Sequence, residues 1–521
     1  MLTRRSIVLL ASLSLLATGA PAATASRPQP AACSAGAAAG GDWPAYGHDA
    51  LNSRTQDAEH LLSPANVGQL AASWVFDTAA TTNGADQSVF NGTPTEADGC
   101  LFAASTGGFV YALNASDGKV VWQRQFTVPT AGLGGVFVGG PVVDHGRVIV
   151  YVDRDSGPYL AALDEHTGEV LWTSAPVYSY PGGYTNATPQ VFGGLVFAGF
   201  SPPEGDPKGV GGFALLDATS GALLKVTSTI PAEDAKQGYA GGGIWSTPAY
   251  DAATRYAYVG AGNPYSRNLE HKNVNAILKI DLDRDRSTFG DIVGSYKGNV
   301  DQYSQALETL SQTPACEAGS DQTLPLDDPA CGQLDLDFGA APNLFRDANG
   351  RLLVGDLQKS GVYHVADAAT MTPAWTQIVG LSCQACNAAS TAVDANGVFL
   401  EGTPGGVMWS LSHDGARQWA DPVGDGAHYQ AISTANGVVF TVDNAGALAA
   451  WDAASGVPLL RRPLSLDTMN GDVAATSAGI AIAGHTIFVS ASAGPAGGAS
   501  ALGIAPPDGT ATGVIVAYRL P

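Results

Sequence analysis

The chain of 521 residues is long enough for a large hydrophobic core, and it contains 65 glycines, 31 prolines and only 14% charged residues. This turn-rich composition, with few stretches of helical periodicity, predicts an all-β protein. The net charge of −22 excludes nucleic-acid-binding proteins that rely on phosphate contacts, and it favours cations or a basic electron-transfer partner.

The N-terminus has the pattern of a secretory signal peptide over residues 1–25. Arg4 and Arg5 precede an apolar run over 7–17, which is too short to span a membrane. We therefore expect export to a secreted or periplasmic location. We also expect a disordered Ala/Gly/Pro-rich segment over 26–41, one mature domain over 42–521 and no membrane span.

Six cysteines in an exported chain favour disulfide bonds. Cys316 and Cys331 flank a Pro/Asp-rich insertion and are predicted to close it. The sequence leaves the pairing of Cys33 and Cys100 open.

The other two cysteines, Cys383 and Cys386, form a C-x-x-C motif. The following residue is Asn387 rather than histidine, which excludes a c-type haem attachment site. A local disulfide is the favoured interpretation.

One cassette recurs along the chain: an alternating strand, a turn with aspartate and glycine, and a short strand that often carries tryptophan. In its clearest form the strand 160–164 is followed by Thr167, Gly168 and Trp172. The turn tolerates left-handed dihedral angles, and the tryptophan offers a large apolar face to the next unit. The cassettes lie at 110–122, 160–172, 213–221, 276–281, 362–375, 407–419, 448–456 and 514–519.

The last of these strands, 514–519, has nothing after it and needs a partner. The run 70–76 near the start can supply the outer strand of that same blade, and such closure removes exposed strand edges. With a repeat period of roughly 40 to 85 residues, we predict one eight-bladed β-propeller, with seven blades as the alternative.

A candidate site lies around Trp245, which follows three glycines, and Asn263, which comes just after an alternating strand over 256–259. A flat ring and a neutral oxygen at loop positions favour a planar cofactor beside a hard cation. The alternative interpretation is a core tryptophan and an Asn-Pro turn.

These features resemble the pyrroloquinoline quinone (PQQ) dependent alcohol dehydrogenases, which are eight-bladed quinoprotein propellers. The cassette resembles the quinoprotein blade signature, and residues 42–47 and 62–70 resemble that family's start. The resemblance covers essentially the whole mature chain, although non-catalytic scaffold propellers share the blade signature. It implies PQQ and Ca²⁺ or a lanthanide as cofactors.

The resemblance assigns roles to residues on the N-terminal side of the site. Trp245 corresponds to the tryptophan beneath the quinone, and Asn263 to the asparagine that gives the cation an oxygen. Ser201 corresponds to a serine near the cofactor, and Glu204 to a glutamate that binds the cation; a solvated loop acid is the alternative for Glu204.

Further along, 334–339 resembles the family's catalytic Asp-x-Asp entry to a strand. Asp335 would be the general base that takes the alcohol proton and would also face the metal. Asp337 would add a charged metal ligand, and Lys359 would stabilise charge on the quinone oxygens. The alternatives are a solvated acidic loop and a surface lysine.

The chain also departs from the family. Asn91 replaces a common first-blade glutamate, and 132–140 lacks the adjacent cysteines and the arginine over the quinone. Asn186 stands where threonine is frequent and is taken as a cofactor-binding position. The favoured function is a PQQ- and metal-dependent oxidation of secondary or polymeric alcohols with an external electron acceptor. The alternatives are a non-catalytic propeller that binds protein or glycan, and a lyase or hydrolase without quinone.

Overall fold

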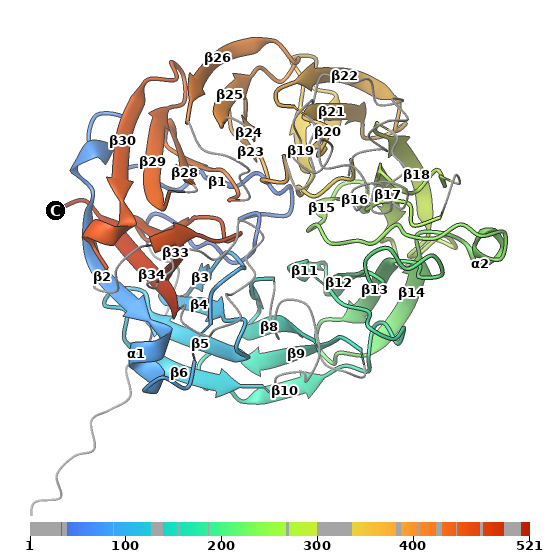
Figure 1. Cartoon of the computed structure of the whole chain (residues 1–521), viewed down its shortest axis with the longest axis horizontal. Helices are drawn as coiled ribbons and strands as arrows, with labels where there is room; N and C mark the ends of the chain where they lie inside the picture. The colour runs from blue at the N-terminus through green and yellow to red at the C-terminus, as the bar shows by residue number, and fades with distance from the viewer. Residues whose placement is uncertain are drawn as a thin grey trace, which may run out of the picture.

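Eight mainly antiparallel sheets form a closed ring in the computed structural model (Figure 1). The structure describes these residues: 33, 39–86, 88–126, 139–153, 157–185, 187–266, 270–299, 336–381, 387–403, 406–423, 430–443, 445–468, 473–493 and 512–521. The expected signal peptide, Cys316, Cys331, Cys383 and Cys386 lie outside them. The ring confirms the prediction of an eight-bladed propeller rather than a seven-bladed one.

Each blade contains four consecutive strands, numbered here from the innermost outward. Blade 1 is β3 (Thr95–Ala97), β4 (Cys100–Ala104), β5 (Phe109–Asn114) and β6 (Val120–Gln125). Blade 2 is β7 (Val142–Asp144), β8 (Arg147–Val152), β9 (Tyr159–Asp164) and β10 (Val170–Thr173). Blade 3 is β11 (Gln190–Phe192), β12 (Leu195–Phe200), β13 (Gly212–Asp217) and β14 (Leu223–Ser228). Blade 4 is β15 (Ala249–Asp251), β16 (Tyr256–Gly260), β17 (Ala276–Asp281) and β18 (Ile292–Lys297).

The second half of the ring repeats this plan. Blade 5 is β19 (Asn343–Arg346), β20 (Leu352–Leu357), β21 (Val362–Asp367) and β22 (Pro373–Ile378). Blade 6 is β23 (Ala392–Val393), β24 (Val398–Gly402), β25 (Val407–Leu411) and β26 (Arg417–Pro422). Blade 7 is β27 (Ser433–Ala435), β28 (Val438–Val442), β29 (Ala447–Asp452) and β30 (Pro458–Pro463), with β1 (Thr55–Gln56) added beside β27.

Blade 8 closes the ring with strands from both ends of the chain. It consists of β31 (Val473–Ala475), β32 (Ala481–Ala483), β33 (Thr486–Ala493), β34 (Thr512–Arg519) and the N-terminal β2 (Ala71–Asp77). β2 pairs antiparallel with β34, from Ala71 opposite Arg519 to Asp77 opposite Val514. This pairing confirms the predicted closure, which covers the edge that the last strand would otherwise expose.

Helices play a minor part in the described residues. The two α-helices are α1 (Thr78–Thr82) and α2 (Ala232–Ala235), and the 3₁₀ turns are η1 (Val67–Gln69) and η2 (Leu464–Leu466). Each of these helices is far shorter than a bilayer-crossing helix, so the described part of the chain contains none.

Burial follows the position of a strand within its blade. A middle strand such as β12 is buried at all six positions, because neighbouring blades cover both of its faces. The outer strand β14 instead leaves several side chains exposed. This distribution explains why the middle strands are continuous apolar runs in the sequence.

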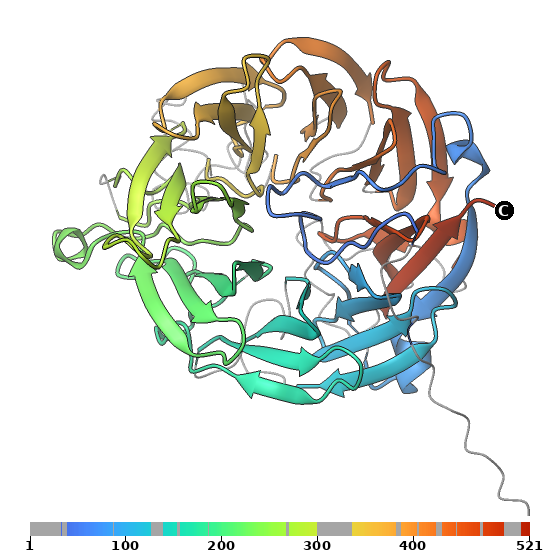
Figure 2. The same ribbon diagram turned by 180° about the vertical axis from the view of Figure 1, so that it is seen from behind.

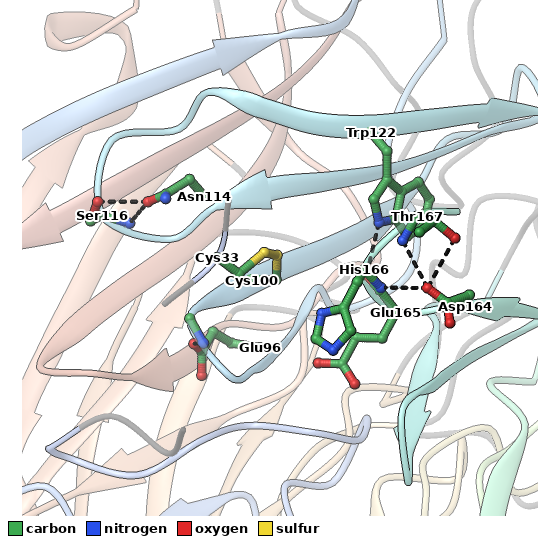
Figure 3. Close-up of a disulfide and its surroundings, with 11 residues drawn as sticks. Cys33, Glu96, Cys100, Asn114, Ser116, Trp122, Asp164, Glu165, His166 and Thr167 are labelled. Carbon is green, nitrogen blue, oxygen red and sulfur yellow. Dashed lines mark hydrogen bonds between the residues drawn. A yellow bond between two sulfur atoms is a disulfide. The ribbon is translucent and has the colours of Figure 1, made fainter. Parts of the chain in front are cut away.

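The tryptophan of one cassette packs on the glycine turn of the next blade, as the sequence predicted. Trp122 donates from Nε1 to the Glu165 carbonyl at 2.8 Å, beside the turn that Asp164 and Thr167 build (Figure 3). Gly168 has φ +69°, and a Cβ added there would lie 2.6 Å from the Trp122 ring. The same contact recurs at Trp74, Trp172, Trp375 and Trp419, which face Gly118, Gly221, Gly415 and Gly456.

This contact makes a glycine-to-alanine test possible. Gly146 has a similar φ, +77°, but no atom within 4 Å of an added Cβ. We expect Gly146→Ala to cost about 1–2 kcal/mol for the left-handed backbone, and Gly168→Ala about 1–3 kcal/mol more because the methyl displaces Trp122. Denaturant unfolding of both variants measures the difference. Equal losses would show that Trp122 moves aside freely.

The segment 43–56 joins the blades at the centre of the ring, and Figure 2 shows it in blue crossing that centre. Its backbone carbonyls accept hydrogen bonds from the innermost strands of successive blades. They are Pro44 from Val143, Ala50 from Tyr250, Leu51 from Leu344, Ser53 from Val393 and Arg54 from Thr434. The N-terminal segment is thus a structural part of the propeller.

Cys33 and Cys100 form a disulfide, which answers the pairing that the sequence left open (Figure 3). Cys100 begins β4, so this bond fastens Cys33, within the segment expected to be disordered, to blade 1. The described residues contain no free cysteine.

Candidate functional site

Trp245 and Asn263 are held side by side by the backbones around them. Trp245 lies in the loop before β15, and Asn263 in the loop after β16. The N–H of Gly242 donates to the Asn263 carbonyl at 2.8 Å, and the N–H of Gly262 donates to the Gly243 carbonyl at 2.7 Å. A Cβ on Gly243 would lie 2.4 Å from Ser201 Oγ, so glycine is required for this close approach. Trp245 is half-buried, whereas Asn263 is buried.

Asp337 and Lys359 complete a charged cluster over the indole of Trp245. Lys359 Nζ lies 2.6 Å from Asp337 Oδ1, and both side chains are more than nine-tenths buried. Trp245 Nε1 donates to Asp337 Oδ2 at 2.9 Å, and the ammonium lies 4.8 Å from the indole ring centre. Buried charges of this kind are costly unless paired, so the cluster is an ordered polar site within a packed ring.

The backbone also fixes this cluster. The Lys359 N–H donates to the Asp337 carbonyl at 3.1 Å, and Phe338 forms an antiparallel bridge with Gln358. The side chain of Asn387 donates to the Lys359 carbonyl at 3.1 Å and accepts from the Thr403 N–H at 2.9 Å. Asn387 therefore ties the Lys359 backbone to blade 6, a role that no sequence motif indicated.

Ser201 and Glu204 approach the cluster from blade 3. Ser201 directly follows β12, is 2% exposed, and its Oγ has no hydrogen-bond partner among the described residues. Glu204 is exposed. Ser201 is thus a buried hydroxyl available to a ligand, and Glu204 can move toward one.

Tyr184 reports that these groups share one pocket. Its backbone pairs with that of Ser201 through hydrogen bonds of 3.0 and 2.9 Å. Burial raises the pKa of Tyr184 most, and the charges of Glu204 and Asp337 raise it further, whereas Lys359 lowers it. A single phenol therefore lies within electrostatic range of a predicted metal ligand, the Asp-x-Asp motif and the predicted lysine.

Comparison with known proteins identifies the family. The family model PQQ_2, described as outer membrane protein assembly factor BamB, matches residues 68–301 and 330–514. The chain belongs to the PQQ_2 family.

Relatives of this PQQ_2 protein include dehydrogenases. It is 27% identical over 465 residues to a polyvinylalcohol dehydrogenase of Sphingopyxis sp. (strain 113P3), which covers 80% of this chain and 66% of the relative. The chain thus spans slightly less than two thirds of that relative's length. These matches confirm the resemblance to quinoprotein alcohol dehydrogenases that the sequence indicated.

Solved structures share the fold. A quinohemoprotein alcohol dehydrogenase from Comamonas testosteroni superposes with a TM-score of 0.68 at 17% identity, covering 92% of this chain and 80% of that chain. BamB from Moraxella catarrhalis superposes with a TM-score of 0.52 at 14% identity, covering 86% and 99%. Because an enzyme and an assembly factor share this ring, the fold does not decide the function of the PQQ_2 protein, and the site must.

The residues present fit a planar anionic quinone. The face of Trp245, the unpaired Ser201 hydroxyl and the glycine approach at Gly243 together form a polar cradle beside an aromatic ring. Asn263, Glu204 and Asp337 offer the oxygen ligands that Ca²⁺ prefers. Within the described ranges, no three His, Cys, Asp or Glu side chains already converge on one point. Asp335 and Asn186 lie outside the described residues.

Proposed function

We propose that this PQQ_2 protein is an extracytoplasmic dehydrogenase that uses PQQ and Ca²⁺ or a lanthanide to oxidise alcohols. The observation that carries this proposal is the buried cluster of Asp337 and Lys359 over the Trp245 ring. PQQ, when bound, supplies a two-electron acceptor for the alcohol hydride. The polyvinylalcohol dehydrogenase relative supports secondary or polymeric alcohols as the substrate class.

The chain's own residues have distinct parts in this proposal. Trp245 offers its face to the ring of the cofactor, and Ser201 and Asn186 orient its polar edge. Asp335 accepts the proton of the alcohol hydroxyl. Lys359 provides positive charge where negative charge develops on the quinone oxygens.

The metal has a specific consequence for Lys359. In the structure the ammonium of Lys359 neutralises Asp337 at 2.6 Å. A cation held by Asp337, Asn263, Glu204 and Asp335 replaces that charge, and the ammonium is then free to face the cofactor. The electrons leave to an external acceptor, for which the acidic surface favours a basic partner.

Reconstitution tests the proposal with a matched pair of variants. Purified protein is mixed with PQQ and either Ca²⁺ or La³⁺, and quinone absorbance and alcohol-dependent dye reduction are recorded together. Trp409 is also half-buried beneath a cation, because the Arg417 guanidinium lies 4.7 Å from its ring centre. We expect Trp245→Ala to weaken quinone binding about tenfold to a hundredfold through lost stacking, while Trp409→Ala binds normally.

The family description supports one alternative, a non-catalytic propeller that binds protein or glycan. Absence of bound quinone with either metal in the wild-type protein would favour it. In that case neither tryptophan variant changes a quinone signal.

A further inference from the structure

A buried acid that no motif marked, Asp153, lies at the same structural position as the site residues of other blades. It directly follows β8, the second strand of blade 2. Ser201 directly follows β12, and Asn263 and Lys359 come within three residues of the ends of β16 and β20. Equivalent connections in a propeller emerge at one end of the ring, so Asp153 belongs to the same rim of side chains.

Electrostatic coupling supports this placement independently of the repeat. Asp153 is one of the charges that raise the pKa of Tyr184, together with Glu204 and Asp337. Tyr184 is joined to Ser201 through its backbone. Asp153 is therefore within range of the same phenol as the charged cluster over Trp245.

The carboxyl of Asp153 is poorly satisfied by the protein. Asp153 is 9% exposed, and its Oδ1 is buried without a hydrogen-bond partner among the described residues. The backbone N–H of Thr185 donates to this carboxyl. Among the described residues, the titratable groups that face it are Tyr151, on its own strand, and Tyr184. Neither is a cation, so the protein supplies no positive charge there.

Burial of this kind favours a neutral carboxylic acid. Desolvation raises the pKa of Asp153 to about 8, and the Thr185 N–H opposes the shift only in part. A neutral acid carries an O–H donor, which a carboxylate lacks. A donor aimed into a pocket that lacks the usual arginine can bind an anionic oxygen, and such O–H···O⁻ bonds are strong.

We propose that Asp153 binds the ligand of this site as a protonated acid, donating its O–H to a carboxylate oxygen of the bound quinone. The inference rests on the proposed function, because it needs a carboxylate-bearing ligand in the pocket beside Trp245. It adds a ligand contact from blade 2, where the residues usual in quinoprotein dehydrogenases are missing. It also makes quinone affinity depend on a proton held by the protein.

The test is a binding titration without turnover. Metal-loaded protein free of quinone is titrated with PQQ from about pH 6 to about pH 10, with tryptophan fluorescence quenching as the readout. Because only the protonated acid donates, the wild-type Kd is expected to be constant below pH 8 and to weaken about tenfold per pH unit above it. Asp153→Asn keeps an N–H donor that does not titrate, so its Kd stays flat above pH 8.

Asp153→Leu removes the donor and is expected to bind about tenfold more weakly at every pH, without the slope that belongs to Asp153. Subtracting the Asp153→Asn profile removes contributions from Tyr184, Lys359 and the metal ligands. Circular dichroism confirms that both variants are folded. Tight quinone binding with the same pH profile in wild type and Asp153→Asn would overturn the inference and leave the proposed function standing. Absence of quinone binding at any pH would overturn both.

Discussion

Replacing Asp337 by asparagine is expected to lower quinone-dependent alcohol oxidation by about two to four orders of magnitude. The amide keeps the shape of the side chain but cannot neutralise Lys359, which lies 2.6 Å away, or a bound cation. It also weakens the acceptor for Trp245 Nε1. Dye reduction by the loaded protein measures the loss, and quinone absorbance in the same sample measures loading.

Asp335→Asn separates the two roles proposed for the Asp-x-Asp motif. If Asp337 mainly holds the cation, higher metal concentrations recover part of the activity of Asp337→Asn. The activity of Asp335→Asn does not recover, because the variant lacks the proton acceptor although it still binds quinone. Asp285→Asn is the control, since Asp285 is 91% exposed and lies in a surface turn. Turnover above one tenth of wild type in a fully loaded Asp337→Asn would contradict the role of Asp337.

The architecture of this protein was predictable because the repeat carries local chemistry. Each Thr-Gly or Ser-Gly turn needs a left-handed glycine, and each tryptophan needs that glycine to pack against, so both leave a mark in the sequence. The closure of blade 8 was predictable because an unpaired strand at 514–519 requires a partner. Trp245, Asp337 and Lys359 were predictable because they lie in motifs, and the structure brings them into contact.

Tyr184, Asp153 and Asn387 were not found, because their roles arise from packing between blades. An isolated aspartate after a strand resembles any turn residue, and nothing in its spacing says that its carboxyl is buried. The signal that could have found Asp153 is its register in the repeat, directly after the second strand of a blade, as for Ser201. The Cys33–Cys100 bond likewise joins residues 67 positions apart, and only the folded blade brings them together.

The largest effect on stability is expected from Arg54, which is fully buried where the N-terminal segment crosses the ring. Its guanidinium donates to the carbonyls of Tyr46, Ile432 and Ile480 and to Ser433 Oγ. Ile432 directly precedes β27 of blade 7, and Ile480 directly precedes β32 of blade 8. Burial lowers the pKa of Arg54 to about 10, so the side chain is still charged at neutral pH.

Arg54→Met is expected to reduce the free energy of unfolding by about 3–5 kcal/mol, because three buried carbonyls lose a charged donor that an apolar chain cannot replace. Arg417→Met is the matched control, since Arg417 is exposed and makes one backbone hydrogen bond, to the Ile378 carbonyl at 2.7 Å. Its loss should stay below about 1 kcal/mol. Denaturant midpoints of the two variants, measured without quinone or metal, give the comparison. Equal midpoints would mean that the blades close without the Arg54 hydrogen bonds, and that β2 pairing with β34 alone holds the ring.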